Sequence, residues 1–386
     1  MLTRRNILRF CYQGPLFAGA LTSGRVSRSQ AQGLGTDYDV IIVGAGVAGL
    51  AAAESLLTLD DELKVLVLEA RDRIGGRVYS VRRDDLSHDV DLGAQYINAI
   101  GGVEWEPIKR LQLRAESAGT NKVELRPGSG ALTRALASVA DGNIQLNSRV
   151  SEVFWRDGLA GVYYDNRGLR SAVTTRRLLV TLPPAVLRAG GLVFTPTLDL
   201  ARQEAISDIA AEPSLSCAMV FNSDKAPLLA DGESWTRDSA EQHFRARRTG
   251  NRNLTLLEAQ YRGVSADTLA SEEASLVLRL ALQEFEPALK GLPLLEDSLW
   301  SAYTDWQQDQ FSAGGRSVAG TASVHAALRA DVAGTLFFAG DAACDATLAG
   351  TVEGAYSSGR RAAQDIADSL GLGDASAGEE PLFELL

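Results

Sequence analysis

The chain has 386 residues, 45% of them hydrophobic and 23% charged, and a formal net charge of -11 at pH 7. This is the composition of an ordinary globular protein, and the length supplies core for two or three domains. The negative charge argues against a nucleic acid or an anionic membrane surface as partner, and no apolar run approaches the ~20 residues of a membrane span. The three histidines are too scattered to suggest a metal site.

The N-terminal segment, residues 1–31, stands apart in composition. Arg4 and Arg5 precede a moderately apolar stretch, and residues 29–31 (SQA) are small residues of the kind that a signal peptidase prefers. This pattern resembles a twin-arginine export signal, whose pathway carries folded proteins. We therefore expect a signal peptide and a periplasmic or secreted protein; the alternative is a disordered basic tail.

A βαβ unit follows the N-terminal segment. The β-branched run of residues 38–43 predicts a central parallel strand that is buried on both faces. Residues 50–57 are helix formers, and residues 64–68 form a second apolar run. The pattern predicts strand, helix and strand within about 30 residues, the length of one such unit.

The turn of this unit carries the glycines of a dinucleotide-binding site. Gly44, Gly46 and Gly49 form G-x-G-x-x-G directly after the first strand, and Glu69 ends the second strand. The first glycine makes a tight turn, the second admits a pyrophosphate, and the third lets the helix pack on the strand. The phosphates are expected at the helix N-terminus, with Glu69 accepting hydrogen bonds from the ribose hydroxyls.

Residues 69–80, EARDRIGGRVYS, distinguish FAD from NAD. The pattern E-A-R-x-R-x-G-G-R resembles the extended FAD signature of the flavin amine oxidase superfamily. That superfamily includes monoamine, polyamine and L-amino-acid oxidases and histone demethylases, with protoporphyrinogen oxidases and carotenoid desaturases as relatives. The resemblance implies that Arg71 and Arg77 lie near the pyrophosphate, where a guanidinium fork suits phosphate oxygens, and that Gly76 keeps the backbone close.

Further motifs appear in the order that the family has them. Residues 91–97 (DLGAQYI) resemble the segment beside the isoalloxazine ring. Residues 144–153 resemble the return of the chain to the FAD domain, with Val150 contacting the adenine region through its backbone. Residues 178–187 resemble the strand and Pro-Pro exit that follow.

The last motif lies near the C-terminal end, in LFFAGDAACDATLAGTVEGAYSSGRRAA. The resemblance implies a strand ending at Gly340 and Asp341, on the ribityl-phosphate side of the flavin. It also implies a helix beginning near Thr351, with its N-terminus aimed at the flavin pyrimidine, where it would stabilise the negative charge of reduced flavin. The GAYSSG stretch inside this helix lacks the strand-turn-helix elbow of a serine nucleophile.

The resemblance therefore implies noncovalently bound FAD and a defined set of contacts to it. The residues expected to line the flavin ring and the substrate are Gln95, Tyr96, Trp306 and Thr351. The residues expected to bind FAD are Gly44, Gly46, Ala48, Gly49, Glu69, Ala70, Arg71, Gly76, Arg77, Gly93, Ala94, Gln95, Tyr96, Val150, Gly340, Asp341, Gly350, Thr351 and Val352.

The expected fold class is α/β, with a Rossmann-like FAD-binding domain that is discontinuous in sequence. An α+β substrate domain built on a mixed sheet accompanies it. The FAD domain is expected in residues 36–99, 127–187 and 335–370, the substrate domain in 100–126 and 188–334, and an acidic tail in 371–386.

Three segments of the substrate domain have clear patterns. Residues 217–221 (CAMVF) and 254–261 (LTLLEAQY) are typical of strands. Residues 271–285 predict an amphipathic helix with Ser271 as its cap and acids in its first turn.

Several positions depart from the family's pattern. Only residues 98–126 separate the GAQ segment from the return motif, where typical amine oxidases have a long helical block. By alignment, Ser216 replaces the lysine that is water-linked to flavin N5. Ser317 and Thr351 replace the two aromatic residues that flank the flavin. Much of the usual cavity wall is therefore missing, or comes from elsewhere.

Further positions bear on the substrate and on the cofactor linkage. Tyr96 stands where L-amino-acid oxidases carry the arginine that anchors the substrate carboxylate. Arg316 stands where some monoamine oxidases attach the flavin to a cysteine. Trp306 matches a family tryptophan near the flavin, although core packing explains it as well. Cys217 and Cys344 are expected to be buried free thiols, but the sequence does not exclude a disulfide between them.

Three functions remain open. The leading one is an FAD-dependent oxidase in which an amine gives a hydride to flavin N5 and O2 reoxidises the flavin to release H2O2. The second is a dehydrogenase or desaturase acting on a C–C bond, which suits the missing lysine and aromatic pair. The third is a non-catalytic flavin-binding protein that acts in a complex. A small-molecule substrate, large or presented by a partner, is expected, and an oligomer remains open.

Overall fold

The computed structural model describes most of the chain in one compact unit that begins at Thr36. The expected signal peptide, residues 1–31, lies outside the described residues, as does nearly all of the expected acidic tail. The described ranges are 36–98, 105–118, 122–229, 234–250, 253–318 and 320–372.

The βαβ unit lies at the centre of the larger of two main sheets. Strand β1 (Tyr38–Val43) pairs in parallel with β2 (Val65–Leu68) on one side and with β11 (Leu169–Val180) on the other. Helix α2 (Val47–Leu59) connects β1 to β2. The strand prediction for residues 38–43 is confirmed: residues 40–43 are β-branched and buried, as in a strand covered on both faces, whereas Tyr38 and Asp39 at its start are half-buried.

The larger sheet mixes parallel and antiparallel pairs in the order β12-β9-β10-β11-β1-β2-β8, with β18 also pairing with β11. Strand β12 pairs with β9 in this sheet, although its segment was predicted to belong to the substrate domain. Phe194 of β12 is buried and packs against Phe338, with 6.4 Å between the ring centroids, and this contact favours the pairing. The additional strands are β8 (Ile144–Gln145), β9 (Ser148–Arg156), β10 (Leu159–Asn166), β12 (Val193–Thr195) and β18 (Leu336–Phe338).

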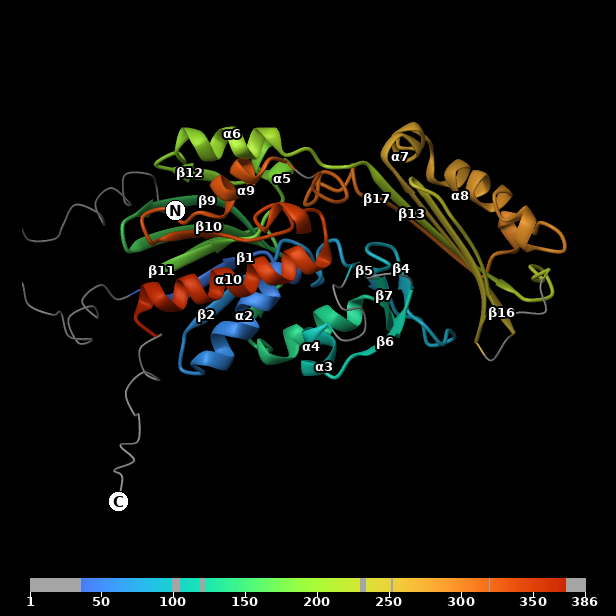
Figure 1. Cartoon of the computed structure of the whole chain (residues 1–386), viewed down its shortest axis with the longest axis horizontal. Coiled ribbons are helices and arrows are strands. Elements are labelled where there is room, and N and C mark those ends of the chain that lie inside the picture. The colour runs from blue at the N-terminus through green and yellow to red at the C-terminus, as the bar shows by residue number, and fades with distance from the viewer. Residues whose placement is uncertain are drawn as a thin grey trace, which may run out of the picture. The chain divides into compact units, whose positions relative to one another are not determined.

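Helices cover both faces of this sheet (Figure 1). Helices α2, α4 (Gly130–Val139) and α10 (Val352–Leu370) cover one face, and residues of all three belong to one buried cluster. The other face carries α5 (Pro184–Arg188), α6 (Leu200–Asp208) and α9 (Ala322–Arg329). Helices α2 and α10 approach closely, since a Cβ on Gly359 would lie 2.2 Å from the carbonyl oxygen of Ala48.

The second main sheet has the order β14-β15-β16-β13-β17, and its pairs among the described residues are antiparallel. Helices α7 (Gly263–Leu269) and α8 (Ala274–Gln283) cover one of its faces, with short 3-10 turns at Glu286–Ala288 and Leu295–Asp297. The strands are β13 (Ser214–Asn222), β14 (Ser234–Asp238), β15 (Gln242–Thr249), β16 (Leu254–Arg262) and β17 (Trp300–Asp305).

Two predicted strands of this sheet, at residues 217–221 and 254–261, are confirmed within β13 and β16. The predicted Ser271 cap is wrong. Helix α8 begins at Ala274 after Glu273, which makes no side-chain capping bond. Because α7 ends at Leu269, the residues up to Glu273 are used in the turn between the two helices.

Small elements occupy the place of the missing helical block. Strands β5 (Ile97–Asn98), β6 (Arg114–Ser117) and β7 (Lys122–Arg126) form a three-stranded antiparallel sheet, with the short helix α3 (Glu106–Arg110) between β5 and β6. A hairpin of β3 (Ser80–Val81) and β4 (Val90–Asp91) precedes it, and a 3-10 turn, Ala346–Leu348, precedes α10.

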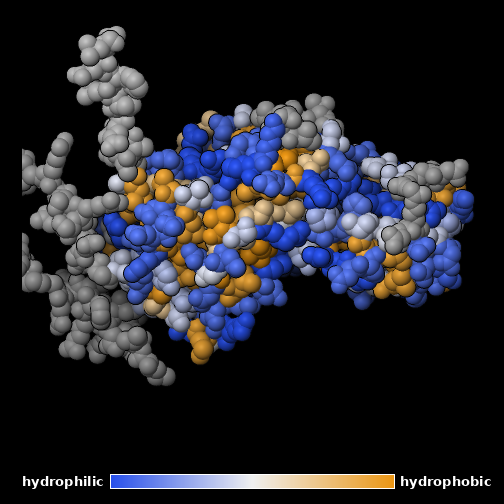
Figure 2. Space-filling view, turned by 90° about the horizontal axis from the view of Figure 1, so that it is seen from below, coloured by the Kyte–Doolittle hydropathy of each residue, from blue (hydrophilic) through white to orange (hydrophobic). Residues whose placement is uncertain are grey.

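The polarity of the surface, the membrane-spanning potential and the state of the cysteines can be described from the structure. Figure 2 shows hydrophilic and hydrophobic areas interspersed on the face that is seen from below. Among the described residues, no helix is both long enough and apolar enough to cross a bilayer. Cys217 and Cys344 are buried free thiols.

Candidate functional site

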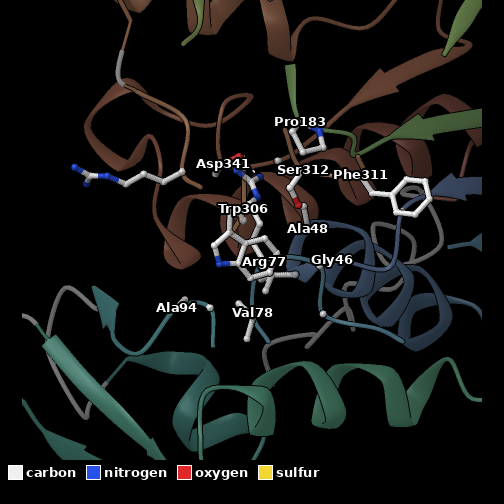
Figure 3. A pocket seen from close by; sticks show the side chains of 18 of the residues that line it. Gly46, Ala48, Arg77, Val78, Ala94, Pro183, Trp306, Phe311, Ser312 and Asp341 are labelled. Atoms are coloured by element: carbon white, nitrogen blue, oxygen red, sulfur yellow. Dashed lines mark hydrogen bonds and ion pairs between the residues drawn. The ribbon is translucent and has the colours of Figure 1, made fainter. Parts of the chain in front are cut away.

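A cavity of about 410 Å³ opens between the larger sheet, the small sheet of β5 and β7, and one end of the second sheet (Figure 3). Its wall includes the turn after β1, the segment after β2, the start of α10 and the loop that follows β17. Pockets at the carboxyl ends of parallel strands are where open α/β sheets bind their ligands.

The glycine turn gives this cavity a bare backbone wall. Gly44 has a φ of +108°, and a Cβ on it would lie 2.5 Å from Thr181 Oγ1. A Cβ on Gly49 would lie 2.0 Å from the carbonyl oxygen of Gly44, so this glycine lets α2 pack on the turn. Gly46 lines the cavity, and a Cβ there would meet nothing within 4 Å. The N-terminus of α2 is therefore open to an anion.

Glu69 lies in the same wall and is buried. Its Oε2 accepts a hydrogen bond from the Ala45 N–H at 2.8 Å, and its Oε1 accepts one from the Arg71 N–H at 2.9 Å. Each carboxylate oxygen has two lone pairs, so both oxygens retain capacity to accept from hydroxyl groups of a ligand. Ala70 and Val150 line the cavity beside it.

Arg71 and Arg77 both line the cavity, but both also have carboxylate partners. Arg71 Nη2 donates to Asp309 at 2.5 Å and to Ser312 at 2.9 Å. Arg77 binds Asp341 through two hydrogen bonds of 3.0 and 2.6 Å (Figure 3). Burial by itself would raise the pKa of Asp341, but the charge and hydrogen bonds of Arg77 hold this pKa below its usual value. The Arg71 pair joins the segment after β2 to the loop after β17, and the Arg77 pair joins it to the segment after β18.

Polar and aromatic residues line the other end of the cavity. Trp306 is 2% exposed, and its Nε1 donates to the Leu92 carbonyl at 3.1 Å, so it serves both the core and the cavity wall. The Tyr96 hydroxyl lies 2.8 Å from His243 Nε2, and burial raises the pKa of Tyr96 to about 12. Gln95 is buried, and its Oε1 has no partner among the described residues.

Helix α10 presents its N-terminus to the cavity. Thr351 caps it: its Oγ1 accepts from the Gly354 N–H at 2.9 Å and donates to the Leu348 carbonyl at 2.7 Å. Gly350 has a φ of +73°, and a Cβ on it would lie 2.3 Å from the Ser317 carbonyl oxygen. Val352, the first residue of the helix, lines the cavity.

The structure brings the sequence-predicted residues together around this cavity. All of them line it except Gly49, which packs behind the turn. Ser216 and Ser317 are buried outside the lining, whereas Arg316 lines the cavity and pairs with Glu212 at 2.6 Å. Lining residues that the sequence reasoning did not assign to the site include Thr181, Pro183, Lys122, Ser214, Gln260, Arg262, Gln310 and Phe311.

These features fit FAD. A bare helix N-terminus suits the diphosphate, and a carboxylate with free lone pairs suits the ribose. The N-terminus of α10 and the buried, unpartnered Oε1 of Gln95 suit a polar, redox-active ring at the far end.

Two family descriptions match the chain. "Flavin containing amine oxidoreductase" matches residues 100–367, and "NAD(P)-binding Rossmann-like domain" matches residues 42–108. The first covers more than half of the chain. The chain thus has the Rossmann-like domain expected from its sequence, and its cofactor is FAD.

Amine oxidases are also among its curated relatives. Pig flavin-containing amine oxidase B is 46% identical over 88 residues, which are 22% of this chain and 16% of that protein. Dog flavin-containing amine oxidase A is 45% identical over 71 residues, 18% of this chain and 13% of that protein. The match thus spans less than a fifth of the length of these relatives.

Solved amine oxidases share the fold at low sequence identity. Cyclohexylamine oxidase from Brevibacterium oxydans superposes with a TM-score of 0.69 and 17% identity, over 87% of this chain and 100% of that one. Wild-type putrescine oxidase bound to putrescine gives a TM-score of 0.68 and 16% identity, over 86% and 99%. The chain belongs to the flavin containing amine oxidoreductase family, whose members are FAD-dependent enzymes.

Proposed function

We propose that this protein is an oxidoreductase of amine oxidase type that removes a hydride from an amine substrate. The observation that carries the proposal is the continuity of the cavity. It runs from the glycine turn and Glu69 to Gln95, Tyr96 and Trp306, so a dinucleotide held at one end would present its ring to a substrate at the other.

When bound, FAD would supply the two-electron acceptor for the hydride, with O2 as the proposed final acceptor and H2O2 as its product. The chain's own residues have the simpler tasks of orienting the substrate and excluding water. Trp306 and Gln95 are buried, and the Tyr96 hydroxyl forms a hydrogen bond with His243. Because burial keeps the Tyr96 hydroxyl protonated, it offers the substrate a neutral polar group.

Noncovalent attachment of FAD is part of the proposal. Arg316 stands where some relatives attach the flavin to a cysteine, and it is engaged with Glu212. Cys217 and Cys344 are the free cysteines among the described residues, and neither lines the cavity. Flavin that stays with the protein after denaturation would contradict this part.

The substrate is proposed to be larger than a simple monoamine, or to be presented by a partner. Thr351 lines the cavity without an aromatic ring, and Ser317 lies outside its lining, so neither of these two positions supplies a ring to flank a small amine. Such flanking contributes about 0.5–2 kcal/mol. Tyr96 in place of an arginine also removes a bidentate anchor for an α-carboxylate.

Steady-state assays of peroxide release under air test the proposal, with small monoamines, polyamines and the twenty amino acids as substrates. We expect poor turnover of benzylamine-like amines and of free L-amino acids. A kcat/KM above about 10⁴ M⁻¹s⁻¹ for any free α-amino acid, within the ordinary enzyme range, would overturn this view of the cavity.

A second assay, in which reduction of the flavin is followed by its absorption, separates the alternatives. Bleaching of the flavin by a substrate with an activated C–C bond, with an artificial electron acceptor and no response to amines, favours the dehydrogenase or desaturase. No bleaching with either class favours a non-catalytic flavin protein. Ser216 in place of the family's lysine suits the dehydrogenase or desaturase, whereas the shortened substrate domain is what permits a non-catalytic flavin protein.

A further inference from the structure

The second sheet turns one of its faces toward the cavity. Tyr261 of β16 belongs to the buried core under α7 and α8, so its neighbour Gln260 lies on the opposite face, because side chains alternate along a strand. Gln260 Nε2 donates to the Gly93 carbonyl at 2.5 Å. The inner face of β16 therefore lies against the segment that leads to Tyr96.

Arg262 ends the same strand and shares this face. It follows Gln260 by two residues, a rise of about 7 Å along the strand. In the sheet it lies opposite Ser214 of β13, and both residues line the cavity. Gln260 is paired with His243 of β15, and His243 contacts Tyr96. Arg262 therefore lies further along the sheet than the point at which the sheet meets Tyr96.

Arg262 is a half-buried residue, yet its guanidinium has no hydrogen-bond or ion-pair partner in the part of the chain that the structure describes. Its backbone N–H donates to the Glu241 carbonyl at 2.7 Å. The Glu241 carboxylate itself is engaged elsewhere, accepting from the N–H and hydroxyl of Ser265 at 3.0 and 2.8 Å. A partly desolvated cation without a partner is unfavourable, so this arrangement indicates an anionic ligand.

The other charged groups around the cavity leave no acid for Arg262. Lys122 adds a second cation, with its Nζ 5.7 Å from the centre of the Tyr96 ring and no carboxylate partner among the described residues. The three lining acids are all engaged: Glu69 with two backbone N–H groups, Glu212 with Arg316 and Asp341 with Arg77. Lys122 and Arg262 therefore give the part of the cavity along the second sheet a positive charge, although the chain as a whole carries a net charge of -11.

We propose that Arg262 binds a carboxylate on the substrate, separated by several bonds from the carbon that loses its hydride. The inference rests on the proposed function of the cavity and defines its substrate class further. It is compatible with poor turnover of α-amino acids, because their carboxylate is attached directly to the reacting carbon and does not span the distance along β16.

The test measures binding to the FAD-loaded protein, with the shift in the visible absorption of the flavin as the readout. The probes are 4-phenylbutyrate and its uncharged analogue 4-phenylbutanamide. We expect the carboxylate to bind the wild-type protein more tightly than the amide. Arg262→Gln should weaken the carboxylate roughly tenfold to a hundredfold, the range of a lost charge-assisted pair, and leave the amide unchanged.

Two further variants make the result specific. Arg262→Lys keeps the charge but loses the planar fork, so carboxylate binding should fall by less. Arg279→Gln removes an arginine on the exposed side of α8, where it pairs with Glu296 at 2.6 Å, and should change neither probe. Equal binding of the two probes, no binding of either, or an unchanged Kd in Arg262→Gln would overturn the inference. Carboxylate binding that depends on Arg262, with no amine able to reduce the flavin, would instead overturn the proposed amine oxidation and leave the anion site standing.

Discussion

At the scale of single residues, Glu69 is the most direct test of cofactor binding. Glu69→Ala should weaken FAD binding by about 1.5–3 kcal/mol, or roughly tenfold to a hundredfold, because it removes the acceptor for the ribose hydroxyls. It also leaves the N–H groups of Ala45 and Arg71 without their partner. Titration of the apoprotein with FAD, followed by flavin fluorescence, measures the change.

The control for this variant is Glu62→Ala, which removes an exposed acid shortly before β2. It should bind FAD like the wild type. If Glu69→Ala also binds FAD like the wild type, the carboxylate is not a cofactor ligand, and a colourless wild-type protein that ignores added FAD would refute the whole assignment.

Asp91 predicts a dependence of stability on pH. Burial raises its pKa from 3.8 to about 7, although it accepts hydrogen bonds from Ser80 and from the Ser129 N–H. Between these two values the folded state binds more protons than the unfolded state, so this residue's contribution to stability falls as the pH rises toward 7, and it is constant above that. The slope is at most about 1.4 kcal/mol per pH unit.

Urea unfolding at several pH values between 4 and 8 measures this effect. The difference in unfolding free energy between the wild type and Asp91→Asn should shift in favour of the variant as the pH rises through that window. Asp84→Asn, at an exposed position, should run parallel to the wild type. A pH-independent difference for Asp91→Asn would show that the buried carboxyl is not the titrating group.

The sequence motifs predicted which residues come together at the cavity, but they did not predict the ion-pair partners of those residues. The spacing of Gly44, Gly46 and Glu69 is local, and the structure has them in one wall. The partners of Arg71 and Arg77, Asp309 and Asp341, lie more than 200 residues away along the chain. No local pattern links such positions.

At the scale of elements, the N-terminus of α10 depends on Thr351. Thr351→Ala should lower the unfolding free energy by about 0.5–2 kcal/mol, because the Gly354 N–H loses the oxygen that caps it. Thr351→Ser keeps that oxygen and should stay close to the wild type. Chemical denaturation of the three proteins, with and without added FAD, measures the effect; equal midpoints for Ala and Ser would rule out the cap as a source of stability.

Elements with a strong local pattern were predictable, and those defined by distant contacts were not. Strand β1 carries its signal in six consecutive residues. Strand β12 has three residues, and it exists because β9 lies beside it. Lys122 and Arg262 escaped the sequence reasoning for the same reason: pairing of β7 with β5 and of β16 with β13 places them at the cavity.

At the scale of the whole molecule, we propose export in the folded state by a twin-arginine pathway. Residues 1–35 lie outside the described part of the structure, so the proposal rests on their sequence. A reporter fused behind these residues should leave the cytoplasm when Arg4 and Arg5 are present and remain inside when both are lysine. Fractionation of cells that express the two fusions measures this. Equal export of both would refute a twin-arginine signal.

The pairing of β18 with β11 has a consequence for the order in which the protein matures. The larger sheet receives β18 from residues 336–338, and the cavity receives the N-terminus of α10 from residue 352 onward, long after the glycine turn has been made. A chain still attached to the ribosome, with these residues inside the exit tunnel, has the glycine turn but no far wall to the cavity. Stable flavin loading must then wait until α10 has emerged and folded, so chains arrested before α10 should be made without captured FAD, whereas chains that include α10 should acquire it.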